Sequence, residues 1–303
     1  MRKKIILIGG PTGVGKTKLG ILCANKFNGE IISTDSIAIY KHLDIGSAKP
    51  NKEEQKMAVH HQIDIVEPNS EYSVSNFVEQ TRKIIDDLIS KNKLPILVGG
   101  TGLFMKSLLY PYNFGGSDKN EEIRKKYTKM ADENSNEFVY NILKEIDPIS
   151  ASKIHSNDLK RVVRAIEIYE TTGKPKSNNE EGQSLYDFML IFLNGDRTEI
   201  YNRINERVDN MINLGLEDEI KTLIKDYGLT RENQSMQGIG YKEWFDYFDG
   251  KISYEELIEK IKINSRHYAK RQITWFKAMP KVREYNYKNV DKITADIEEF
   301  LSK

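Results

Sequence analysis

The sequence predicts an α/β fold in which a parallel sheet is flanked by helices, with a helical segment inserted into the chain. A short apolar run at 5–8 leads directly into the glycine-rich segment GPTGVGKT at 10–17, and a helical pattern follows at 18–27. Further short apolar runs alternate with helical periods along the chain, which is typical of parallel sheets. The stretch 115–184 instead carries charged helical patterns with few apolar residues.

The glycine-rich segment fits the phosphate-loop template G-x-x-x-x-G-K-[ST] at every fixed position. Its glycines allow successive backbone N–H groups to face a polyanion, and the helix that follows directs its positive end at the same place. Lys16 adds a positive charge for terminal phosphates, and the Thr17 hydroxyl can hold a magnesium ion. The sequence therefore predicts a P-loop NTPase-like core with these phosphate-binding residues: Gly10, Pro11, Thr12, Gly13, Val14, Gly15, Lys16 and Thr17.

Composition and charge limit the partners and surroundings that we expect. The chain has 303 residues and a net charge of +1, so an RNA-binding surface has to be a local patch. Its one cysteine, Cys23, cannot form an internal disulfide and is expected to be a small buried hydrophobe. Because no apolar run has the length of a membrane span or a signal peptide, we expect a cytoplasmic protein.

Apolar runs predict four further strands, at 30–34, 63–66, 93–98 and 187–193. The first of these delivers Asp35 and Ser36 to its carboxyl end, where ligands gather in parallel sheets, so we expect Asp35 near the phosphate loop. Gly99, Gly100 and Thr101 follow the run at 93–98, where a P-loop ATPase commonly carries an Asp that orders magnesium and water. This difference weakens the interpretation that the protein hydrolyses ATP, but it does not exclude the interpretation that it is a kinase.

The neighbouring histidines His60 and His61 invite a metal-site interpretation. They precede the predicted strand at 63–66, and no carboxylate or further histidine stands at ligand spacing. Hydrogen bonding within the fold is therefore the favoured interpretation.

The residues from 115 to 184 are predicted to form a helical insertion, which divides the catalytic core into 1–114 and 185–303. One predicted helix, at 158–169, has an apolar face and carries Lys160, Arg161 and Arg164 on its other side.

Other helices are predicted at 72–90, 199–228 and 255–279, the second of them broken near Gly215. On the last one, Arg266, Lys270 and Lys277 lie along one line opposite the apolar side, and no acidic residue occurs between 263 and 283. A phosphate contact and an ordinary solvated face both remain open for this line. The aromatic residues at 244–248 are expected to pack in the core rather than to stack on bases.

A phosphate loop beside a strand-end Asp permits two kinds of chemistry. If the loop holds a triphosphate, the reaction is phosphoryl transfer. If it holds the pyrophosphate of an allylic diphosphate, the reaction is alkyl transfer, and the loop with magnesium stabilises the charge on the departing group. Asp35 then serves as the base for a weak nucleophile such as an aryl amine.

The motifs of the whole chain, in their order, resemble those of the bacterial tRNA dimethylallyltransferases, also called tRNA isopentenyltransferases. The most discriminating blocks are the segment from DS at 35–36 to DIGSAKP at 44–50, and KRQITW at 270–275. The remaining matching motifs are GGPTGVGKT at 9–17, HQIDIV at 61–66, LVGGT at 97–101, ND at 157–158 with Arg161 and Arg164, and GIGYK at 238–242.

The resemblance implies transfer of a dimethylallyl group from dimethylallyl diphosphate to the exocyclic amine of the adenosine that is 3′-adjacent to the anticodon in tRNA. The products are isopentenyladenosine and pyrophosphate. In this family Asp35 is the general base, Thr101 lies beside the reacting centre, and Lys16 with the rest of the phosphate loop holds pyrophosphate and Mg2+ rather than ATP. Because the adenine has to leave its stack, the enzyme is expected to flip it. We expect a monomer.

The same resemblance implies a surface for the tRNA anticodon stem-loop. Arg124 aligns more loosely with an RNA-contacting arginine than the others do. The residues at matching positions are Asp35, Ser36, Ile37, Ala38, Thr101, Arg124, Lys160, Arg161, Arg164, Gln237, Gly238, Gly240, Tyr241, Lys242, Arg266, Lys270, Arg271, Gln272, Trp275 and Lys277.

Three positions depart from the family's pattern. Gly13 replaces a common alanine, which is harmless for phosphate binding. Ala38 stands where many relatives have glutamine, which puts a side-chain base contact in doubt, and Lys160 replaces a glutamine found in some members.

Three alternative functions remain open. A small-molecule or nucleotide kinase explains residues 1–110 but leaves the insertion and the basic final helix without a role. Isopentenyl transfer to free AMP also leaves those parts without one. A non-catalytic RNA-binding module does not account for Asp35 beside an intact phosphate loop.

Overall fold

The computed structural model describes residues 2–111, 120–178 and 182–303. Contacts among residues divide the chain into a core unit, Met1–Leu109 with Leu185–Lys303, and an insertion unit, Tyr110–Ser184. Each unit has its own cluster of buried apolar side chains. Within the described ranges, none of the helices combines the length and the apolar composition that a membrane crossing requires.

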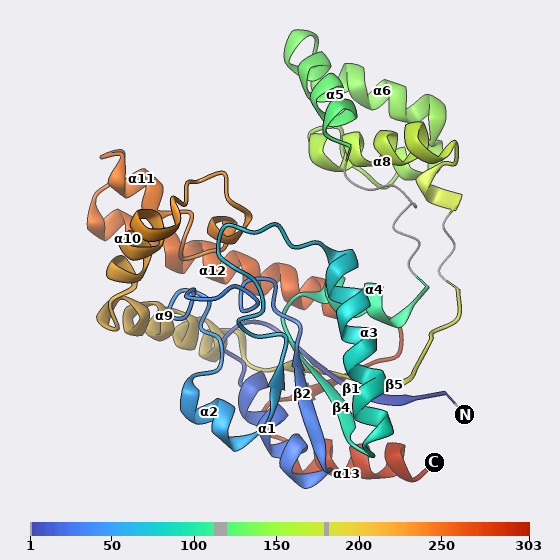
Figure 1. Cartoon of the computed structure of the whole chain (residues 1–303), viewed down its shortest axis with the longest axis vertical. Coiled ribbons are helices and arrows are strands. Elements are labelled where there is room, and N and C mark those ends of the chain that lie inside the picture. Colours follow the sequence, from blue (N-terminus) through green and yellow to red (C-terminus); the bar gives the residue numbers. More distant parts are fainter. Residues whose placement is uncertain (1, 112–119, 179–181) are drawn as a thin grey trace. The chain divides into compact units, whose positions relative to one another are not determined.

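Six strands among the described residues form one sheet in the core unit, in the order β3-β2-β4-β1-β5-β6 (Figure 1). Their bounds are β1 (Lys4–Gly9), β2 (Gly29–Ser33), β3 (His60–His61), β4 (Leu94–Gly99), β5 (Asp187–Asn194) and β6 (Val282–Asn286). Every neighbouring pair is parallel. This arrangement confirms the predicted α/β fold with a parallel sheet flanked by helices.

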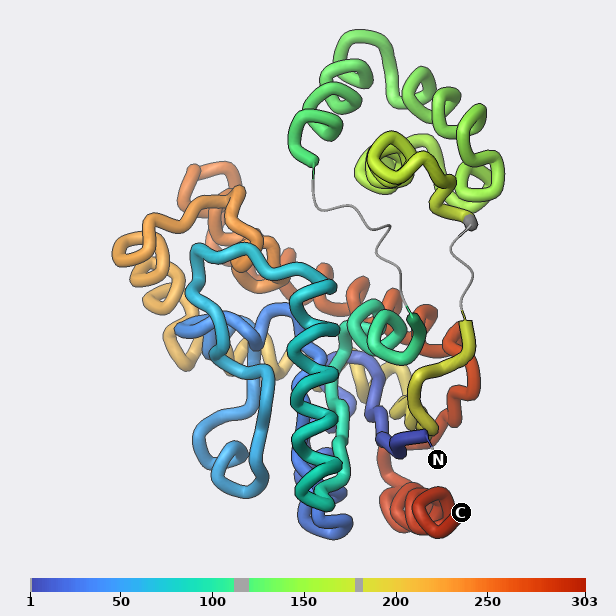
Figure 2. Tube along the Cα trace, turned by 45° about the vertical axis from the view of Figure 1, so that its right-hand side comes forward, coloured from blue at the N-terminus to red at the C-terminus, as the bar shows by residue number. Residues whose placement is uncertain are grey.

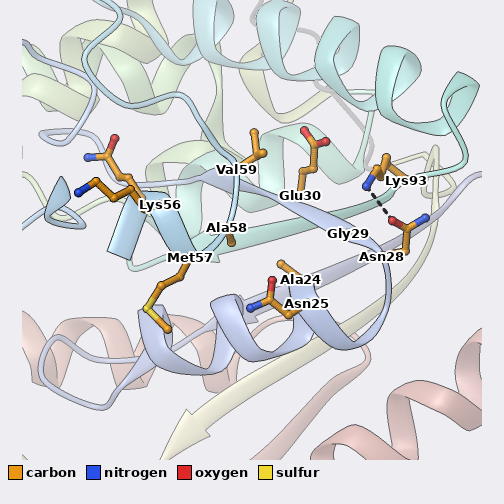
Figure 3. A pocket seen from close by; sticks show the side chains of 11 residues that line it. Ala24, Asn25, Asn28, Gly29, Glu30, Lys56, Met57, Ala58, Val59 and Lys93 are labelled. Carbon is orange, nitrogen blue, oxygen red and sulfur yellow. Dashed lines mark hydrogen bonds between the residues drawn. The ribbon is translucent and has the colours of Figure 1, made fainter. Parts of the chain in front are cut away.

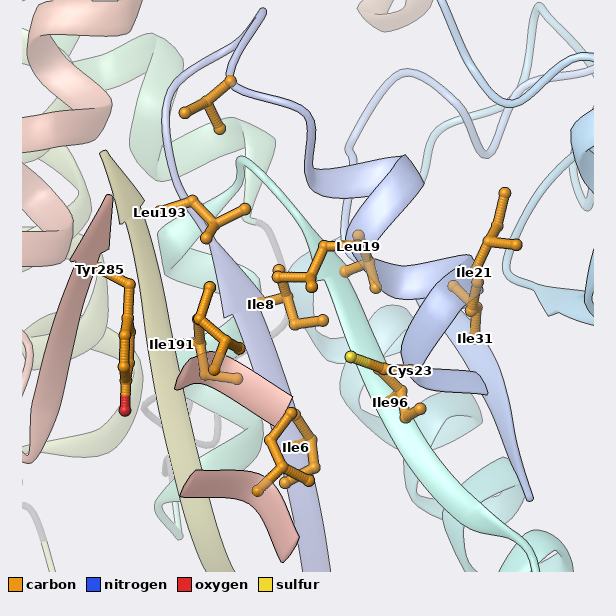
Figure 4. Packing of buried hydrophobic residues seen from close by; sticks show 14 of the residues in the cluster. Ile6, Ile8, Leu19, Ile21, Cys23, Ile31, Ile96, Ile191, Leu193 and Tyr285 are labelled. Carbon is orange, nitrogen blue, oxygen red and sulfur yellow. The ribbon is translucent and has the colours of Figure 1, made fainter. Parts of the chain in front are cut away.

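One face of the sheet packs against α1 (Lys16–Lys26), α9 (Arg197–Asn213) and α13 (Val290–Ser302). Side chains alternate between the two faces of a strand, so Ile6 and Ile8 of β1 both point into this cluster (Figure 4). Cys23 of α1 lies in the same cluster and is fully buried, which confirms the expected small hydrophobe.

The opposite face packs against α3 (Val74–Ser90), α4 (Gly102–Leu109) and α12 (Tyr254–Lys277). Phe192 of β5 stacks on Phe276 of α12, with ring centroids 5.8 Å apart. A Cβ atom at Gly9, the last residue of β1, would lie 2.2 Å from the Phe276 ring, so this position requires glycine. Helix α12 therefore packs closely against the end of β1 from which the phosphate loop begins.

The third strand differs from the prediction. The run at 63–66 forms only an isolated bridge between Val66 and Tyr40, whereas the strand itself consists of His60 and His61. Gln62 and Asp64 both have positive φ angles, of 62° and 55°, which turn the chain away from the extended conformation. An apolar composition alone could not reveal these turns.

The longer predicted helices are present. The pattern at 199–228 forms α9 and α10 (Leu216–Tyr227), and it is broken where expected, at Gly215 with a φ of +90°. The sequence reasoning missed α2 (Lys52–Met57), which has no buried residue, and the edge strand β6, whose side chains are mostly exposed. It also overlooked α13, although buried Ile293 and Ile297 give that helix an apolar period.

The aromatic residues at 244–248 form α11 (Trp244–Phe248). Trp244 is fully buried and its ring contacts Tyr247, Phe248 and Tyr254, so core packing is confirmed for it. Phe248, in contrast, is exposed.

The insertion unit is a small helical bundle of α5 (Glu121–Glu133), α6 (Asn136–Ile146), α7 (Pro148–Ala151) and α8 (Leu159–Thr172) (Figure 2). Side chains cap the helix starts: Asn120 precedes α5, Ser135 precedes α6 and Asp158 precedes α8. The cluster between the helices includes Val139 and Val162, both fully buried.

The segment DIGSAKP at 44–50 has little regular structure, but distant side chains hold it. Glu219 of α10 accepts hydrogen bonds from the backbone N–H groups of residues 44, 45 and 46, at 2.9, 2.7 and 3.2 Å. The Tyr241 hydroxyl donates to Glu219 at 2.8 Å and accepts from the Ser47 N–H at 3.0 Å. Lys49 lies almost fully buried between the carboxylates of Asp44 and Asp64. The shape of this loop therefore depends on α10 and on the turn that contains Tyr241.

Candidate functional site

The phosphate loop joins β1 to α1 at the carboxyl edge of the sheet. Gly13 and Gly15 have φ angles of +80° and +96°, conformations that glycine adopts without strain. The first turn of α1 has no acidic residue, and no side chain caps its N-terminus. The backbone N–H groups at this helix start are therefore available to an anion.

The Lys16 ammonium folds back over the loop and donates to the carbonyl oxygens of Gly10 and Pro11, at 3.0 and 2.8 Å. Burial and, to a smaller extent, the nearby positive charge of Arg207 lower its pKa to about 7, although the Asp35 carboxylate acts in the opposite direction. A second anion beside Lys16 would relieve this unfavourable burial of positive charge.

Arg207 of α9 is a site residue that the sequence reasoning missed. Its Nη1 donates to the Thr12 hydroxyl at 3.0 Å, and its Nη2 donates to the carbonyl oxygen of Ala48 at 3.0 Å. Burial lowers its pKa, yet a guanidinium keeps its charge in proteins. The one available signal was a basic residue beside buried Ile204 and Val208 on a helix that packs against the core.

Asp35 follows β2 and lies beside these two cations, since its charge raises the pKa of both Lys16 and Arg207. Its Oδ1 accepts hydrogen bonds from the N–H groups of Ile37 and Ala38, at 2.9 and 3.3 Å. Its Oδ2 receives no hydrogen bond from any residue that the structure describes. This oxygen is therefore free to accept a proton.

Thr101 follows β4, the neighbour of β2 in the sheet. Its hydroxyl accepts a hydrogen bond from the Ser36 N–H at 3.3 Å, and its own N–H donates to the carbonyl oxygen of Thr34 at 3.2 Å. The structure therefore brings Asp35 and Thr101 together at the ends of two adjacent strands.

Gln272 of α12 connects two parts of this site. Its Oε1 accepts from the Thr12 N–H at 2.9 Å, and its Nε2 donates to the Gly100 carbonyl oxygen at 3.1 Å. We expected Gln272 and Tyr241 to contact RNA, but their side chains are 5% and 0% exposed and hold backbone segments. Ala38, at 1% exposed, likewise offers no surface for a partner.

Two of the three residues in the basic line on α12 have acidic partners, one on the same helix and one on β6. Arg266 donates to Asn205 and pairs with Glu259, and Lys277 lies 3.5 Å from Glu284 of β6. Lys270 and Arg271 are exposed and pair with no acidic residue in the described part of the chain. These two residues leave an exposed positive patch on α12.

Other predicted contact residues lie at the surface of the core unit. Gln237 and Lys242 are exposed on either side of Gly238 and Gly240, where the chain turns. Trp275 is partly exposed and packs so closely on α4 that a Cβ atom at Gly102 would lie 2.0 Å from its ring.

In the insertion unit, Lys160 and Arg161 of α8 are exposed, as expected for contact residues. Arg124 and Arg164 are only partly exposed, because both pair with the buried carboxylate of Glu167. The sequence did not reveal this arrangement, since Arg124 and Glu167 lie on different helices.

The two histidines are held by hydrogen bonds. His60 Nδ1 lies 2.8 Å from the Ala58 carbonyl oxygen, and His61 Nε2 lies 2.7 Å from Glu30. Across the described ranges, no group of three or more His, Cys, Asp or Glu side chains could hold a metal ion. These contacts support the hydrogen-bonding interpretation.

A pocket of about 360 Å³ lies at the opposite edge of the sheet (Figure 3). It is lined by the end of α1, by Gly29 and Glu30 at the start of β2, and by Met57 and Lys93. Parallel strands place their starts and ends at opposite edges, so this pocket is remote from the phosphate loop.

The fold and the site define a P-loop protein with two cations and one carboxylate beside its phosphate loop. The family described as IPP transferase matches residues 38–279, and the family described as isopentenyl transferase matches residues 3–64. The chain belongs to the IPP transferase family.

The similar proteins agree with this assignment. The chain is 45% identical to the tRNA dimethylallyltransferase of Caldanaerobacter subterraneus subsp. tengcongensis, over 100% of the chain and 98% of that relative. It is 46% identical to the protein of the same name from Geobacillus thermodenitrificans, over 99% of the chain and 96% of the relative.

Two solved structures extend the similarity to three dimensions. The tRNA isopentenylpyrophosphate transferase of Bacillus halodurans has a TM-score of 0.75 and 39% identity, covering 100% of this chain and 97% of that one. A eukaryotic dimethylallyltransferase acting on tRNA has a TM-score of 0.82 and 31% identity, and the match covers 98% of this chain and 77% of that one.

Gln272→Leu tests whether this side chain positions the phosphate loop. The substitution leaves the Thr12 N–H and the Gly100 carbonyl without partners, so affinity for inorganic pyrophosphate should fall about tenfold. Isothermal titration calorimetry measures this, with Lys270→Gln, an exposed position on the same helix, as the matched control. Unchanged affinity in Gln272→Leu, or an equal loss in the control, contradicts the assignment.

The pKa of Lys16 predicts a pH dependence. Because this pKa falls from 10.5 in the unfolded chain to about 7, the folded protein binds fewer protons between these values. The contribution of Lys16 to stability therefore increases as pH rises through that window. An anion bound beside Lys16 favours its charged form, so pyrophosphate binding at pH 8 should include proton uptake by Lys16.

Calorimetry at pH 8 in two buffers of different ionisation enthalpy measures this uptake. Lys16→Met serves as the reference that removes the titration of pyrophosphate itself. If wild type and Lys16→Met exchange the same number of protons on binding, Lys16 does not titrate there.

Proposed function

We propose that this protein transfers the dimethylallyl group of dimethylallyl diphosphate to the exocyclic amine of the adenosine 3′-adjacent to the anticodon in tRNA. The products are isopentenyladenosine and pyrophosphate. The observation that supports this most is the position of Asp35, with an open carboxylate oxygen, beside Lys16 and Arg207. The membership in the IPP transferase family and the names of the relatives support the same reaction.

Different residues of the site act on the leaving group and on the attacking amine. As the bond between the allylic carbon and the diphosphate oxygen breaks, negative charge develops on the leaving pyrophosphate. Lys16, Arg207 and the N–H groups at the start of α1 stabilise that charge. As the new carbon–nitrogen bond forms, the Asp35 carboxylate accepts the proton that the adenine amine loses.

The residues present fit a magnesium ion at Thr17. Thr17 is the second residue of α1, it is partly exposed, and its hydroxyl forms no hydrogen bond with a described residue. Magnesium often takes few protein ligands and completes its coordination with phosphate oxygens and water. When bound, the ion supplies further charge neutralisation for the pyrophosphate.

The tRNA is recognised through exposed positive side chains, which on the core unit include Lys270 and Arg271. The reacting adenine has to leave its stack to reach Asp35, so the enzyme flips the base. Lys16, Asp35, Thr101 and Arg207 all come from one chain, which supports action as a monomer. A tRNA substrate also supports a cytoplasmic location.

Incubation with labelled dimethylallyl diphosphate and either tRNA or AMP, beside ATP turnover assays, tests the proposal. Label should enter tRNA alone. Label that enters AMP and never tRNA, or rapid ATP turnover without prenyl transfer, contradicts it.

Asp35→Asn tests the assignment of the base. The amide keeps nearly the same shape but cannot accept the proton, so kcat should fall by about 10²–10⁴-fold. The Kd for tRNA should stay close to that of wild type, because the exposed positive side chains are unchanged. A variant that retains a nearly normal kcat rules out Asp35 as the base.

A further inference from the structure

A buried carboxylate in the insertion unit holds two arginines from different helices. Glu167 of α8 is fully buried, and it receives Nε and Nη2 of Arg124 from α5, each at 3.0 Å. Nη1 of Arg164, on α8 itself, donates to the same carboxylate at 2.7 Å. The backbone N–H of Asn120 donates to it at 2.6 Å. The position of both guanidinium groups is therefore fixed by one side chain.

The Glu167 carboxylate is shared between two guanidinium groups. Burial raises the pKa of Glu167, but the hydrogen bonds from Arg124, Arg164 and Asn120 outweigh it and hold that pKa below its usual value. Glu167 is therefore ionised at neutral pH, and the ion pairs are permanent there.

The two arginines are held in place but still accessible. The side chains of Arg124 and Arg164 are 33% and 29% exposed, in contrast to the fully buried Glu167. Two hydrogen bonds to one carboxylate fix the plane of the Arg124 guanidinium. Its Nη1 group receives no partner from the described residues, so it can donate to a ligand in solution.

Other positive side chains surround the pair. Lys160 and Arg161 are exposed on the same helix, and Lys176 lies close by. Burial lowers the pKa of Lys176, and the charges of Arg161 and Arg164 lower it further. Of the nearby acidic groups, Asp158 pairs with Arg161 at 3.3 Å, and Asp147 accepts backbone hydrogen bonds from Ser150 and Ser177. Acidic and basic residues are nearly balanced across 110–184, so the basic side chains of α8 form a local group.

We propose that Glu167 is a positioning residue for tRNA, which holds Arg124 and Arg164 as a preformed pair that binds the phosphodiester backbone. Guanidinium groups bind phosphate through paired N–H donors, and a fixed pair loses little conformational freedom on binding. This inference rests on the proposed function, since that function supplies the RNA.

The full-length Glu167→Gln variant separates positioning from simple electrostatics. Removing a negative charge from a positive surface would by itself strengthen the binding of a polyanion. Loss of the fixed pair instead weakens it. We expect the Kd and KM for tRNA to rise about tenfold, with kcat and the KM for dimethylallyl diphosphate close to wild type.

Glu170→Gln is the matched control. Glu170 lies on the same helix and also connects α8 to α5, through Lys126 at 3.0 Å and the Tyr127 hydroxyl at 2.6 Å. Its substitution removes the same charge and a comparable link, but it leaves the arginine pair intact. Its Kd for tRNA should not rise. Wild-type tRNA affinity in Glu167→Gln, or an equal loss in Glu170→Gln, overturns the proposal.

Arg124→Gln covers the case in which Glu167→Gln does not fold. This variant leaves Glu167 paired with Arg164 and removes one member of the pair, so tRNA affinity should fall, and wild-type affinity contradicts the proposal. Wild-type protein that transfers no label to tRNA refutes the proposed function instead. Active wild type with an unaffected Glu167→Gln refutes only the role of Glu167.

Discussion

Two partly buried cations that lie beside the phosphate loop are the constraint on which this site depends. Arg207 lies close enough to Lys16 to lower the pKa of that lysine, and the Asp35 carboxylate acts in the opposite direction on the pKa of both cations. Such an arrangement is costly without an anion and favourable with one. It suits a pyrophosphate that gains negative charge as its bond to carbon breaks, because the positive charge is already in place.

The segments that hold this arrangement come from distant parts of the chain. Gln272 of α12 connects the phosphate loop to the residues after β4, and Arg207 of α9 connects the same loop to the segment 44–50. Glu219 and Tyr241 then fix that segment from the other side. Several of the motifs that identify the family therefore share one structural task, which is to hold the backbone around the phosphate loop and Asp35.

The sequence predicted what depends on local pattern and missed what depends on long-range contact. The phosphate loop, the parallel sheet and the position of Asp35 near that loop follow from apolar runs, glycines and the rule that strand ends meet at one edge. Arg207 belongs to no motif and meets the loop only in the folded chain. Gln272 and Tyr241 occur in recognisable motifs, but a motif does not show whether a side chain faces solvent or the interior. The paired arginines of the insertion unit depend on Glu167, more than forty residues from Arg124.

In the proposed reaction the phosphate loop holds a leaving pyrophosphate while Asp35 removes a proton from an adenine amine. Mass analysis of nucleosides from reacted tRNA, together with an assay of released pyrophosphate, tests it most directly. We expect one dimethylallyl group on the exocyclic amine of the adenosine 3′-adjacent to the anticodon, and one pyrophosphate for each modified adenosine. Unmodified nucleosides, or modification with release of orthophosphate in place of pyrophosphate, would contradict it.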